Sequence, residues 1–395
     1  MKDEELILMF KDQEVLSFTV HFGKKCSIKV LEKLEHFERA PYGISEDTCQ
    51  EEMDRIVFKF FNGRTISSSR RDCGLILKAA GCKNYFELSF KGHGLSLADH
   101  YWYRKKDEHL NYDDINFFTN GWDDTFGRAV LNEDYETLKT ADLNVPDIVT
   151  TGWAVKGWLL EDVPRLYKLG IEDGHIEECL GEVLASRLAN RIFGEGEALK
   201  YELKTINGQN ASVSELMIGI DEELIPLSNI IPDDMVPLYL SKSSNHDFMK
   251  KFMERLPELG VPGLREFFVK LMCLRTLCFV ADLHYDNISV IRNLNTGEMR
   301  VAPLYDLAGA FGGTKQAREI LSNLDKGAVL MIFFFYGYID PDWDYSWYDP
   351  KKLEGYEDEI REILSKSEFY TPSLIDNIIK AYRLQKASLD KTAGF

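Results

Sequence analysis

The sequence predicts an α+β protein with a bilobal arrangement. A small β-rich lobe with one long helix precedes a larger helical lobe, and an α+β domain precedes both. Three observations carry this prediction: short alternating apolar and polar runs fill the first part of the chain, strand-like segments surround one long helical pattern in the middle, and helical periodicity dominates after residue 229. With 395 residues, the chain is also longer than one hydrophobic core usually serves.

The N-terminal α+β domain is predicted to span residues 1–143. Residues 6–62 contain short strand-like runs such as LILMF and VLSFTVHF, punctuated by glycine and proline. Residues 95–120 carry many aromatic residues beside acidic ones, and we interpret them as a domain edge that packs on its neighbour. No motif in this region predicts a role for the domain.

The β-rich lobe is predicted to span residues 144–228. The segment IVTTGWAVKGWLL is typical of a strand, a glycine turn and a second strand, and PRLYKLG of a short third strand. The long helix follows in EECLGEVLASRLANRIF, whose apolar residues recur at helical spacing. Two further strands, in ALKYELKTI and SVSELMI, flank a predicted turn at Asn207 and Gly208.

The helical lobe is predicted to span residues 229–395. Helical patterns occupy HDFMKKFMERL, PGLREFFVKLMCLRTLCFVADL and PSLIDNIIKAYRLQKASL. Between the last two lies a hairpin-like segment whose turn is predicted at 295–297. A β-rich lobe with one helix, followed by a helical lobe that carries a polar loop and a hairpin, is the layout of a protein-kinase-like fold. Such a fold would bind nucleotide between its lobes.

Composition and charge exclude several classes of function. Apolar residues make up 45% of the chain, which is enough for sizeable cores. The formal net charge of −18 argues against direct nucleic-acid binding and against an anionic membrane surface, because both need a cationic footprint. The first residues, MKDEELILMF, do not resemble a signal peptide, and the longest apolar run is too short to span a bilayer. Seven cysteines without a CxxC pair predict a cytoplasmic protein with buried free thiols and no zinc site.

Two aspartates and an asparagine in the helical lobe have the spacing of a phosphoryl-transfer site. Asp282 and Asn287 have the D-x-x-x-x-N spacing of a kinase catalytic loop, in which the aspartate is the base and the asparagine a metal ligand. Asp306 ends the apolar strand that follows and suits a second metal ligand. Such oxygen ligands favour Mg²⁺ or Mn²⁺ over zinc. Each aspartate alone would more often cap a helix or form a turn, but the set in this order favours catalysis. His284 either contacts the ligand or fixes the turn, and we prefer the second interpretation.

Two lysines are candidates for the phosphate contact. Lys168 lies within an apolar strand, ahead of the helix that carries Glu182, and would be poorly solvated unless the two formed an ion pair. The alternative is an exposed strand lysine and a surface glutamate. Lys156 follows a thin glycine-rich loop with Gly152 and Gly157, which is explained equally well by a simple hairpin turn.

Four stretches taken together resemble the HipA-like serine/threonine kinases. TTGWAVK is similar to the family's S-x-G-A-Q-x-K phosphate loop, and RLYKLG to its ATP-lysine strand. EECLGEVLASRLANRIF resembles its N-E-x-x-x-x-x-L-A helix, and ADLHYDN with VAPLYDLAGAFG resembles its paired D-x-H-x-x-N and x-P-x-Y-D motifs. The resemblance covers roughly residues 145–390. The loop has Trp153-Ala154-Val155 where the family has Ala-Gln-x, and the first 140 or so residues do not clearly match.

The resemblance implies a role for each candidate residue. Asp282 would be the base, Asn287 and Asp306 the Mg²⁺ ligands, and Lys168 the contact to the α- and β-phosphates. The backbone of 214–217 would be the hinge that receives adenine. The predicted nucleotide-binding residues are Lys168, Glu182, Thr151, Gly152, Lys156, Glu215, Met217 and His284.

The resemblance also implies a reaction and partners. ATP and Mg²⁺ would be the cofactors, with Mn²⁺ as an alternative metal. The γ-phosphate would pass to a serine or threonine hydroxyl of a protein, with autophosphorylation at Thr150 or Thr151 as a further expectation. A small antitoxin-like partner is a further expectation, while the net charge of −18 argues against direct contact between this chain and nucleic acid or membrane.

Three other functions stay open at the level of the sequence. The D-x-H-x-D-N order also resembles the catalytic loop of phosphoinositide kinases, so a lipid or small-molecule kinase is the nearest alternative. A pseudokinase that binds without turnover ranks lower, because all required groups are present. A toxin–antitoxin regulator that acts by binding would have to contact DNA through a partner, since the sequence has no basic helix-turn-helix.

Overall fold

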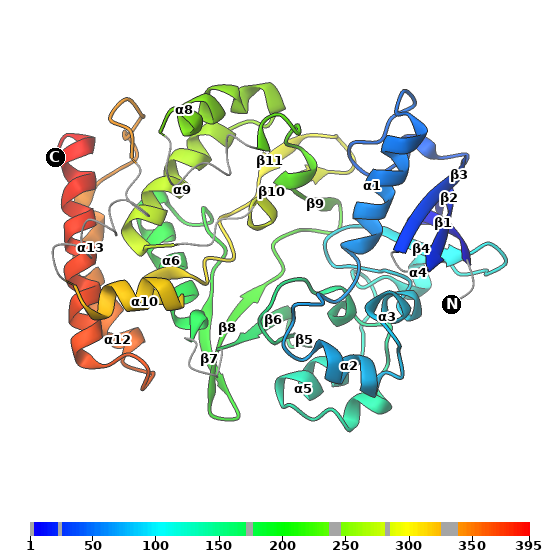
Figure 1. Cartoon of the computed structure of the whole chain (residues 1–395), viewed down its shortest axis with the longest axis horizontal. Helices are drawn as coiled ribbons and strands as arrows, with labels where there is room; N and C mark the ends of the chain where they lie inside the picture. The colour runs from blue at the N-terminus through cyan, green and yellow to red at the C-terminus, as the bar shows by residue number, and fades with distance from the viewer. Residues whose placement is uncertain (1–3, 23–25, 171–176, 237–245, 281–284, 325–338) are drawn as a thin grey trace. The chain divides into compact units, whose positions relative to one another are not determined.

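The computed structural model describes residues 4–22, 26–170, 177–236, 246–280, 285–324 and 339–395 (Figure 1). The chain forms two compact units. The first comprises Met1–Tyr167 with Ile218–Glu223, and the second Lys168–Met217 with Leu224–Phe395. None of the helices in the described ranges has the length and apolar content needed to cross a membrane.

The first unit begins with a four-stranded sheet in the order β3-β2-β1-β4. Its strands pair antiparallel, with Leu8 of β1 opposite Leu16 of β2 and Tyr103 of β4. All five residues of the LILMF run are buried, which shows that both faces of β1 are covered. Residues 95–120, which we interpreted as a domain edge, contribute the strand β4, in which Tyr101, Trp102 and Tyr103 are buried. The strands are β1 (Glu4–Phe10), β2 (Gln13–Phe22), β3 (Cys26–Lys33) and β4 (Tyr101–Lys105).

An aromatic cluster joins this sheet to the helices of the first unit. The ring of Phe61, on α1, lies 5.5 Å from the rings of Phe86 and Phe90 and 5.4 Å from that of Tyr103. Such ring pairs add stabilisation to the burial of their area, so the cluster fixes α1 and α3 against β4. The helices of this unit are α1 (Gln50–Asn62), α2 (Cys73–Ala79), α3 (Tyr85–Lys91), α4 (Tyr112–Ile115) and α5 (Thr125–Leu131).

The glycine-rich stretch of the first unit differs from the prediction at its start. Residues Pro146–Val149 form a 3₁₀ helix where the sequence favoured a strand. Proline suits the first turn of a helix, and the carbonyl oxygen of Asp147 accepts both the N–H and the hydroxyl of Thr150, which closes the turn. The two following strands agree with the prediction: β5 (Lys156–Leu160) and β6 (Pro164–Leu169).

The second unit begins at Lys168, within β6, and contains the predicted long helix. This helix, α6 (Glu178–Phe193), is followed by a hairpin of β7 (Glu202–Ile206) and β8 (Gln209–Glu215). Its register runs from the pair Glu202–Val213 to the pair Ile206–Gln209. Asn207 and Gly208 both have positive φ, 49° and 79°, as a two-residue type I′ turn requires. The predicted turn is therefore present.

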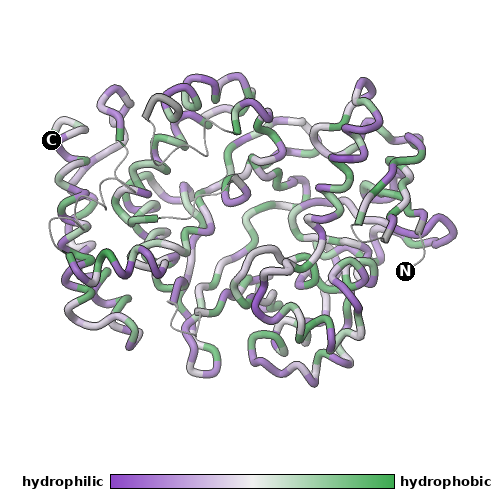
Figure 2. The backbone as a smooth tube through the Cα atoms, viewed as in Figure 1, coloured by the Kyte–Doolittle hydropathy of each residue, from purple (hydrophilic) through white to green (hydrophobic). Residues whose placement is uncertain are grey.

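Helices make up most of the rest of the second unit. Residues Phe268–Cys278 of α9 are all buried, so this helix lies at the centre of the unit and packs on α6 and α13. In Figure 2, hydrophobic and hydrophilic residues alternate along α13, which has one face in the core and one in solvent. The helices are α8 (His246–Arg255), α9 (Leu264–Cys278), α10 (Lys315–Ser322), α12 (Tyr356–Leu364) and α13 (Pro372–Ala393).

The predicted hairpin lies between α9 and α10. Strands β10 (Ser289–Asn293) and β11 (Met299–Val301) pair antiparallel, with Val290 opposite Val301. Gly297 in the turn has a φ of 75°, a conformation that glycine adopts without a steric penalty. Because the two strands are antiparallel, the residues before β10 and the residues after β11 lie at the same end of the hairpin.

The seven cysteines are free, and five of them are buried. Burial raises the pKa of the thiols of Cys273 and Cys278, both on α9, which keeps them protonated and unreactive. This agrees with the expectation of buried free thiols.

A glycine allows α6 to approach the chain that follows the hairpin. A Cβ atom built on Gly181 would lie 2.4 Å from the carbonyl oxygen of Ala310 and 3.2 Å from that of Ala308. These atoms belong to backbone, which cannot turn aside as a flexible side chain can. Only glycine therefore permits this contact, and the next residue on the helix is Glu182.

We predict that Gly181→Ala destabilises the second unit. Either α6 or the 308–310 segment must move, and overpacking of this kind costs about 1–3 kcal/mol of unfolding free energy. Urea unfolding of the purified protein measures the change. The control is Gly74→Ala on α2, where nothing lies within 4 Å of a new Cβ. That substitution should be neutral or should stabilise by about 0.5–1 kcal/mol. Equal effects of the two substitutions would show that the close approach of α6 is unimportant.

Candidate active site

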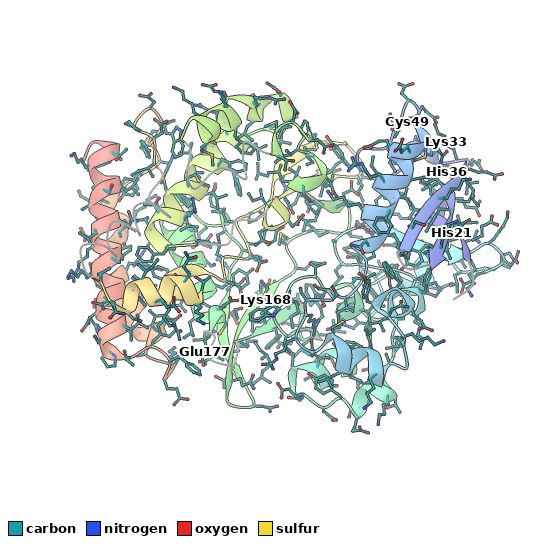
Figure 3. The ribbon with its side chains drawn as sticks, in the orientation of Figure 1. His21, Lys33, His36, Cys49, Lys168 and Glu177 are labelled. Carbon is teal, nitrogen blue, oxygen red and sulfur yellow. The ribbon has the colours of Figure 1, made fainter. Side chains whose placement is uncertain are left out.

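The candidate site of the second unit is built around the side chain of Lys168, which is labelled in Figure 3. Its ammonium group donates to Oε1 of Glu182 at 2.8 Å and to Oδ1 of Asp306 at 2.7 Å. The side chain of Lys168 is only 11% exposed. The ion pair that the sequence predicts between Lys168 and Glu182 is therefore formed, and Asp306 joins it from beyond the hairpin.

The carboxylate of Glu182 is held at both of its oxygens. Its side chain is 1% exposed, and Oε2 accepts a hydrogen bond from the hydroxyl of Ser212 on β8. A buried carboxylate needs such partners, because its charge is costly to remove from water. The contact with Ser212 fixes the direction in which Glu182 presents Oε1 to Lys168.

The backbone of Asp306 adopts a conformation that is uncommon for a residue other than glycine. Its φ is 54°, in the left-handed region, and its N–H donates to the hydroxyl of Tyr201 at 3.3 Å. Residues held in such conformations cluster at functional sites, where the surrounding contacts impose them. The side chain of Asp306 is 35% exposed, so it is more accessible than that of Glu182. It can therefore meet a ligand.

Electrostatics keep Lys168 charged in this environment. Burial acts to lower the pKa of its ammonium group, but the carboxylates of Asp306 and Glu182 outweigh that effect and hold the pKa well above its ordinary value. The ring of Tyr201 lies 5.6 Å from the ammonium nitrogen and adds a cation–π contact. Burial, reinforced by Glu182, raises the pKa of the Tyr201 phenol, which therefore stays neutral.

Asn287 ends the short 3₁₀ helix Tyr285–Asn287, directly before β10. The turn around it is fixed by neighbouring contacts: Asp286 accepts the hydroxyl of Ser228 at 2.5 Å, and its carbonyl oxygen accepts the hydroxyl of Tyr305 at 3.0 Å. The hairpin brings Asn287 and Asp306 to its same end. Asp282 and His284 lie outside the described residues.

The other predicted nucleotide contacts lie in two places. Glu215 ends β8 as an exposed residue, and Met217 follows it half-buried, so the predicted hinge is the end of a strand in the second unit. Thr151, Gly152 and Lys156 belong to the first unit. The ammonium group of Lys156 donates to the carbonyl oxygen of Thr151, which folds the side chain back over its own loop.

Gly152 is required at the tip of this loop because its φ is 92°, a backbone conformation that other residues rarely adopt. The neighbouring Trp153 is 44% exposed, and Thr151 is exposed as well. Thr150 is buried, and its hydroxyl bonds to Arg70 and to the carbonyl oxygen of Asp147. Of the two threonines that the sequence offered for autophosphorylation, only Thr151 is accessible.

Sequence reasoning missed four residues that hold these groups in place. Tyr201 and Ser212 lie in segments that it assigned to strands, where a tyrosine and a serine are ordinary. Arg70 and Asp147 lie in segments without a recognisable motif. The position of Asp147 directly after Pro146, at a helix start, was the only available signal for any of the four.

The sequence itself matches no protein-family model and no curated protein. Among solved structures, the chain is similar to one from the Shewanella oneidensis MR-1 complex of HipA, HipB and operator DNA, with 11% sequence identity and a TM-score of 0.50, over 99% of each chain. A second similar structure is the Helicobacter pylori proinflammatory kinase CtkA, with 14% identity and a TM-score of 0.43 over 61% of this chain and 90% of that one.

The whole-length match defines the fold. The protein has a HipA-like kinase fold, as the α+β layout and the four motifs predicted. At 11% identity the likeness concerns the fold alone. The roles of individual side chains must therefore be argued from the site.

Asp147 makes the stability of the first unit depend on pH. Its side chain is fully buried, and Oδ1 accepts the N–H of Trp158 at 2.8 Å. Burial raises the pKa of the carboxyl to about 7, against the opposing effects of the Trp158 hydrogen bond and of Arg70. The folded protein therefore binds more protons than the unfolded chain between about pH 4 and pH 7, so the contribution of Asp147 to stability falls as pH rises through that window.

We predict that Asp147→Asn removes this pH dependence. Asparagine keeps an acceptor for the Trp158 N–H but cannot ionise. Relative to the parent, the variant should gain unfolding free energy between pH 5 and pH 8, with an upper limit of roughly 4 kcal/mol for a shift of about three pKa units. Urea midpoints at the two pH values measure it, with Asp107→Asn in an exposed turn as the control. A pH slope identical to that of the parent would mean that Asp147 does not titrate in this range.

Proposed function

We propose that the protein is an ATP- and Mg²⁺-dependent phosphotransferase that transfers the γ-phosphate to a serine or threonine hydroxyl of a protein. The observation that carries this proposal is the contact of Lys168 with Glu182 and Asp306. A buried lysine paired with a helix glutamate, beside an aspartate that follows a hairpin, supplies the groups that phosphoryl transfer requires. The HipA-like kinase fold supports the same assignment.

The residues present suit a magnesium ion. Asp306 and Asn287 offer hard oxygen ligands at the same end of the β10–β11 hairpin, and the carboxylate of Asp306 is partly exposed. Among the residues that the structure describes, no group of three or more histidine, cysteine or acidic side chains could hold a metal. A site with two protein ligands relies on nucleotide oxygens to complete it, as is usual for Mg²⁺. When bound, the metal would neutralise charge on the phosphates.

Glu182 gives Lys168 a partner that does not depend on the metal. If the carboxylate of Asp306 binds Mg²⁺, it contributes less charge to Lys168. Glu182, fixed by Ser212, would still hold the ammonium group in place and charged. Lys168 would then be free to direct its remaining donors to the α- and β-phosphates. Tyr201 would keep the backbone of Asp306 in its left-handed conformation throughout.

Asp282 is the proposed base, and its segment leaves α9 at a defined point. Phe279 ends the helix with a φ of 59°, and the buried side chain of Arg275 donates to the carbonyl oxygen of Val280 at 3.2 Å. These contacts fix the chain on the side that leads into the proposed catalytic loop. The Asp286 contacts fix it on the other side. As the base, Asp282 would accept the proton of the attacking hydroxyl.

We further propose a small antitoxin-like protein as partner. The similar chain from Shewanella oneidensis belongs to a complex with HipB and operator DNA. The net charge of −18 disfavours direct contact between this chain and DNA, so any such contact would pass through the partner. The free cysteines favour a reducing cytoplasm.

The metal role of Asp306 predicts that Asp306→Ala loses Mg²⁺-dependent binding of ATP. The substitution removes one of two protein ligands and one partner of Lys168. Isothermal titration calorimetry with ATP, with and without Mg²⁺, should show the parent but not the variant gaining affinity from the metal. Glu298→Ala, at the tip of the same hairpin, is the matched control. Metal-dependent affinity that survives in Asp306→Ala would show that the metal is held elsewhere.

The base role of Asp282 predicts that Asp282→Asn binds Mg·ATP like the parent but transfers phosphate poorly. Asparagine keeps the shape and a hydrogen bond, yet cannot take the proton, which should lower turnover by about 10²–10⁴. Transfer of labelled phosphate to proteins, lipids and small molecules measures the rate and identifies the substrate class. Turnover within a few-fold of the parent would contradict the proposal for Asp282, and transfer to lipids alone would favour the lipid-kinase alternative.

A further inference from the structure

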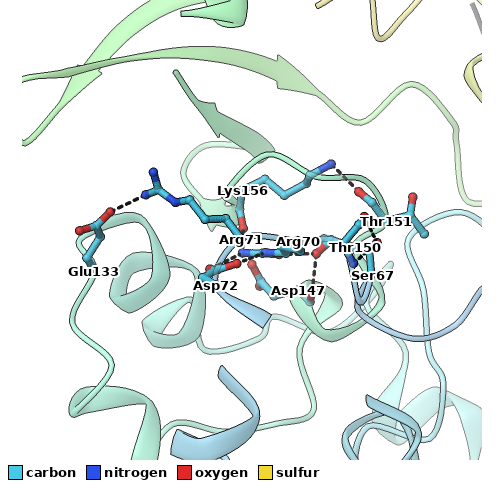
Figure 4. A network of polar contacts seen from close by, with 10 residues as sticks. Ser67, Arg70, Arg71, Asp72, Glu133, Asp147, Thr150, Thr151 and Lys156 are labelled. Carbon is cyan, nitrogen blue, oxygen red and sulfur yellow. Dashed lines mark hydrogen bonds and ion pairs between the residues drawn. The ribbon is translucent and has the colours of Figure 1, made fainter. Parts of the chain in front are cut away.

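A buried arginine of the first unit, which lies outside the candidate phosphate loop at residues 150–156, contacts that loop. Arg70 precedes α2, and its side chain is 0% exposed. Its guanidinium group forms a two-pronged pair with Asp72, through Nε to Oδ1 at 2.7 Å and through Nη2 to Oδ2 at 3.2 Å (Figure 4). The pair leaves the other edge of the guanidinium group directed at the loop.

That edge bonds to both ends of the loop. Nη1 donates to the hydroxyl oxygen of Thr150 at 2.7 Å, and Nη2 donates to the carbonyl oxygen of Lys156 at 2.7 Å. Thr150 and Lys156 are the first and last residues of the TTGWAVK stretch. They lie 80 and 86 positions from Arg70 in the sequence, so a residue of the predicted N-terminal domain closes the loop.

The chain on either side of the loop is held as well. The hydroxyl of Thr150 donates a hydrogen bond to the carbonyl oxygen of Asp147 at 2.8 Å, and the Asp147 carboxyl accepts the N–H of Trp158 at 2.8 Å. Inside the loop, the ammonium group of Lys156 bonds to the carbonyl oxygen of Thr151. The position of that ammonium group therefore depends on the Thr150 side chain and the Lys156 backbone, both of which Arg70 contacts.

Burying this ion pair is an inefficient way to stabilise a fold. Two charges lose their hydration, and a well-packed apolar pair of similar volume is often as stable or more so. A guanidinium group has five donors fixed in one plane, so it can pair with a carboxylate at two atoms and still reach a hydroxyl and a carbonyl oxygen. The geometry therefore fits the fixing of the two ends of the loop, through the Thr150 hydroxyl and the Lys156 carbonyl oxygen, better than it fits general stabilisation.

We propose that Arg70 is a positioning residue for nucleotide binding, which holds both ends of the 150–156 loop so that Lys156 meets the phosphates in a preorganised loop. This inference rests on the proposed kinase function. It gives the predicted N-terminal domain a part in ATP binding that the sequence did not indicate. Preorganisation acts by reducing the freedom that must be lost when the ligand binds.

The neighbouring Arg71 provides a matched control. It is adjacent in sequence, but its guanidinium group pairs with Glu133 at 2.8 Å, and both side chains are partly exposed. Figure 4 shows the pair directed away from Thr150 and Thr151. Arg71→Lys changes the same chemical group without touching the loop contacts.

The test compares Arg70→Lys with Arg71→Lys and the parent. Lysine keeps the charge beside Asp72 but cannot make the two loop contacts as well. We expect Arg70→Lys to raise the Kd for Mg·ATP about tenfold, to raise the KM for ATP more than it lowers kcat, and to speed amide hydrogen exchange in peptides covering 150–156. Arg71→Lys should change none of these. Equal affinity and exchange in Arg70→Lys and the parent overturn the proposal.

Two further variants separate positioning from folding. Thr150→Val removes one loop contact and leaves the Arg70–Asp72 pair intact, so it should weaken Mg·ATP binding even if Arg70→Lys fails to fold. In a Lys156→Met background, Arg70→Lys should cost much less affinity than in the parent, because it acts through Lys156. Additive effects of the two substitutions on the affinity for Mg·ATP would indicate a purely structural role for Arg70.

Failure of the parent to bind Mg·ATP overturns the kinase function itself, and this is seen before any variant is compared.

Discussion

A buried positive charge is the constraint on which the second unit depends. The ammonium group of Lys168 can leave water only because Glu182 and Asp306 meet it there. Ser212 donates a hydrogen bond to the Glu182 carboxylate, and the hydroxyl of Tyr201 accepts the backbone N–H of Asp306. The close approach of α6 to the chain after the hairpin, which Gly181 permits, holds Glu182 beside the same segment that carries Asp306. The strand β6, the helix α6 and the segment after the β10–β11 hairpin thus each contribute one member of this ion-pair cluster.

The first unit solves a similar problem with different chemistry. There the buried cation is Arg70, and its partners are one carboxylate and two neutral oxygen atoms. The arginine side chain stays positively charged in proteins, so these contacts constrain the geometry at every pH. Burial raises the pKa of the Asp147 carboxyl to about 7, which makes the neighbouring turn sensitive to protons. One network therefore combines a permanent charge with one that titrates.

The sequence predicted those features that have local signals. The Asn207–Gly208 turn, the β10–β11 hairpin and α6 follow from turn residues and helical spacing, and the Lys168–Glu182 pair follows from a polar residue in an apolar strand. Arg70 was missed because its loop partners are 80 and 86 positions away, a distance over which pattern carries no information. The strand expected before the glycine loop is a 3₁₀ helix because Pro146 and the Thr150 hydroxyl close a turn. Asp282 and His284 stay predictions.

The contact of Arg70 with both ends of the loop limits where the chain can be truncated and which of its parts can be exchanged by recombination. A boundary drawn at residue 143 would separate Arg70 and Asp72 from Thr150 and Lys156. The shortened chain would keep every kinase motif that the sequence displays, yet leave a buried hydroxyl and a carbonyl oxygen without their donor. The motifs are therefore not a transferable module. Recombination that exchanged the first 143 residues for an unrelated domain would have to supply a new donor at the same place.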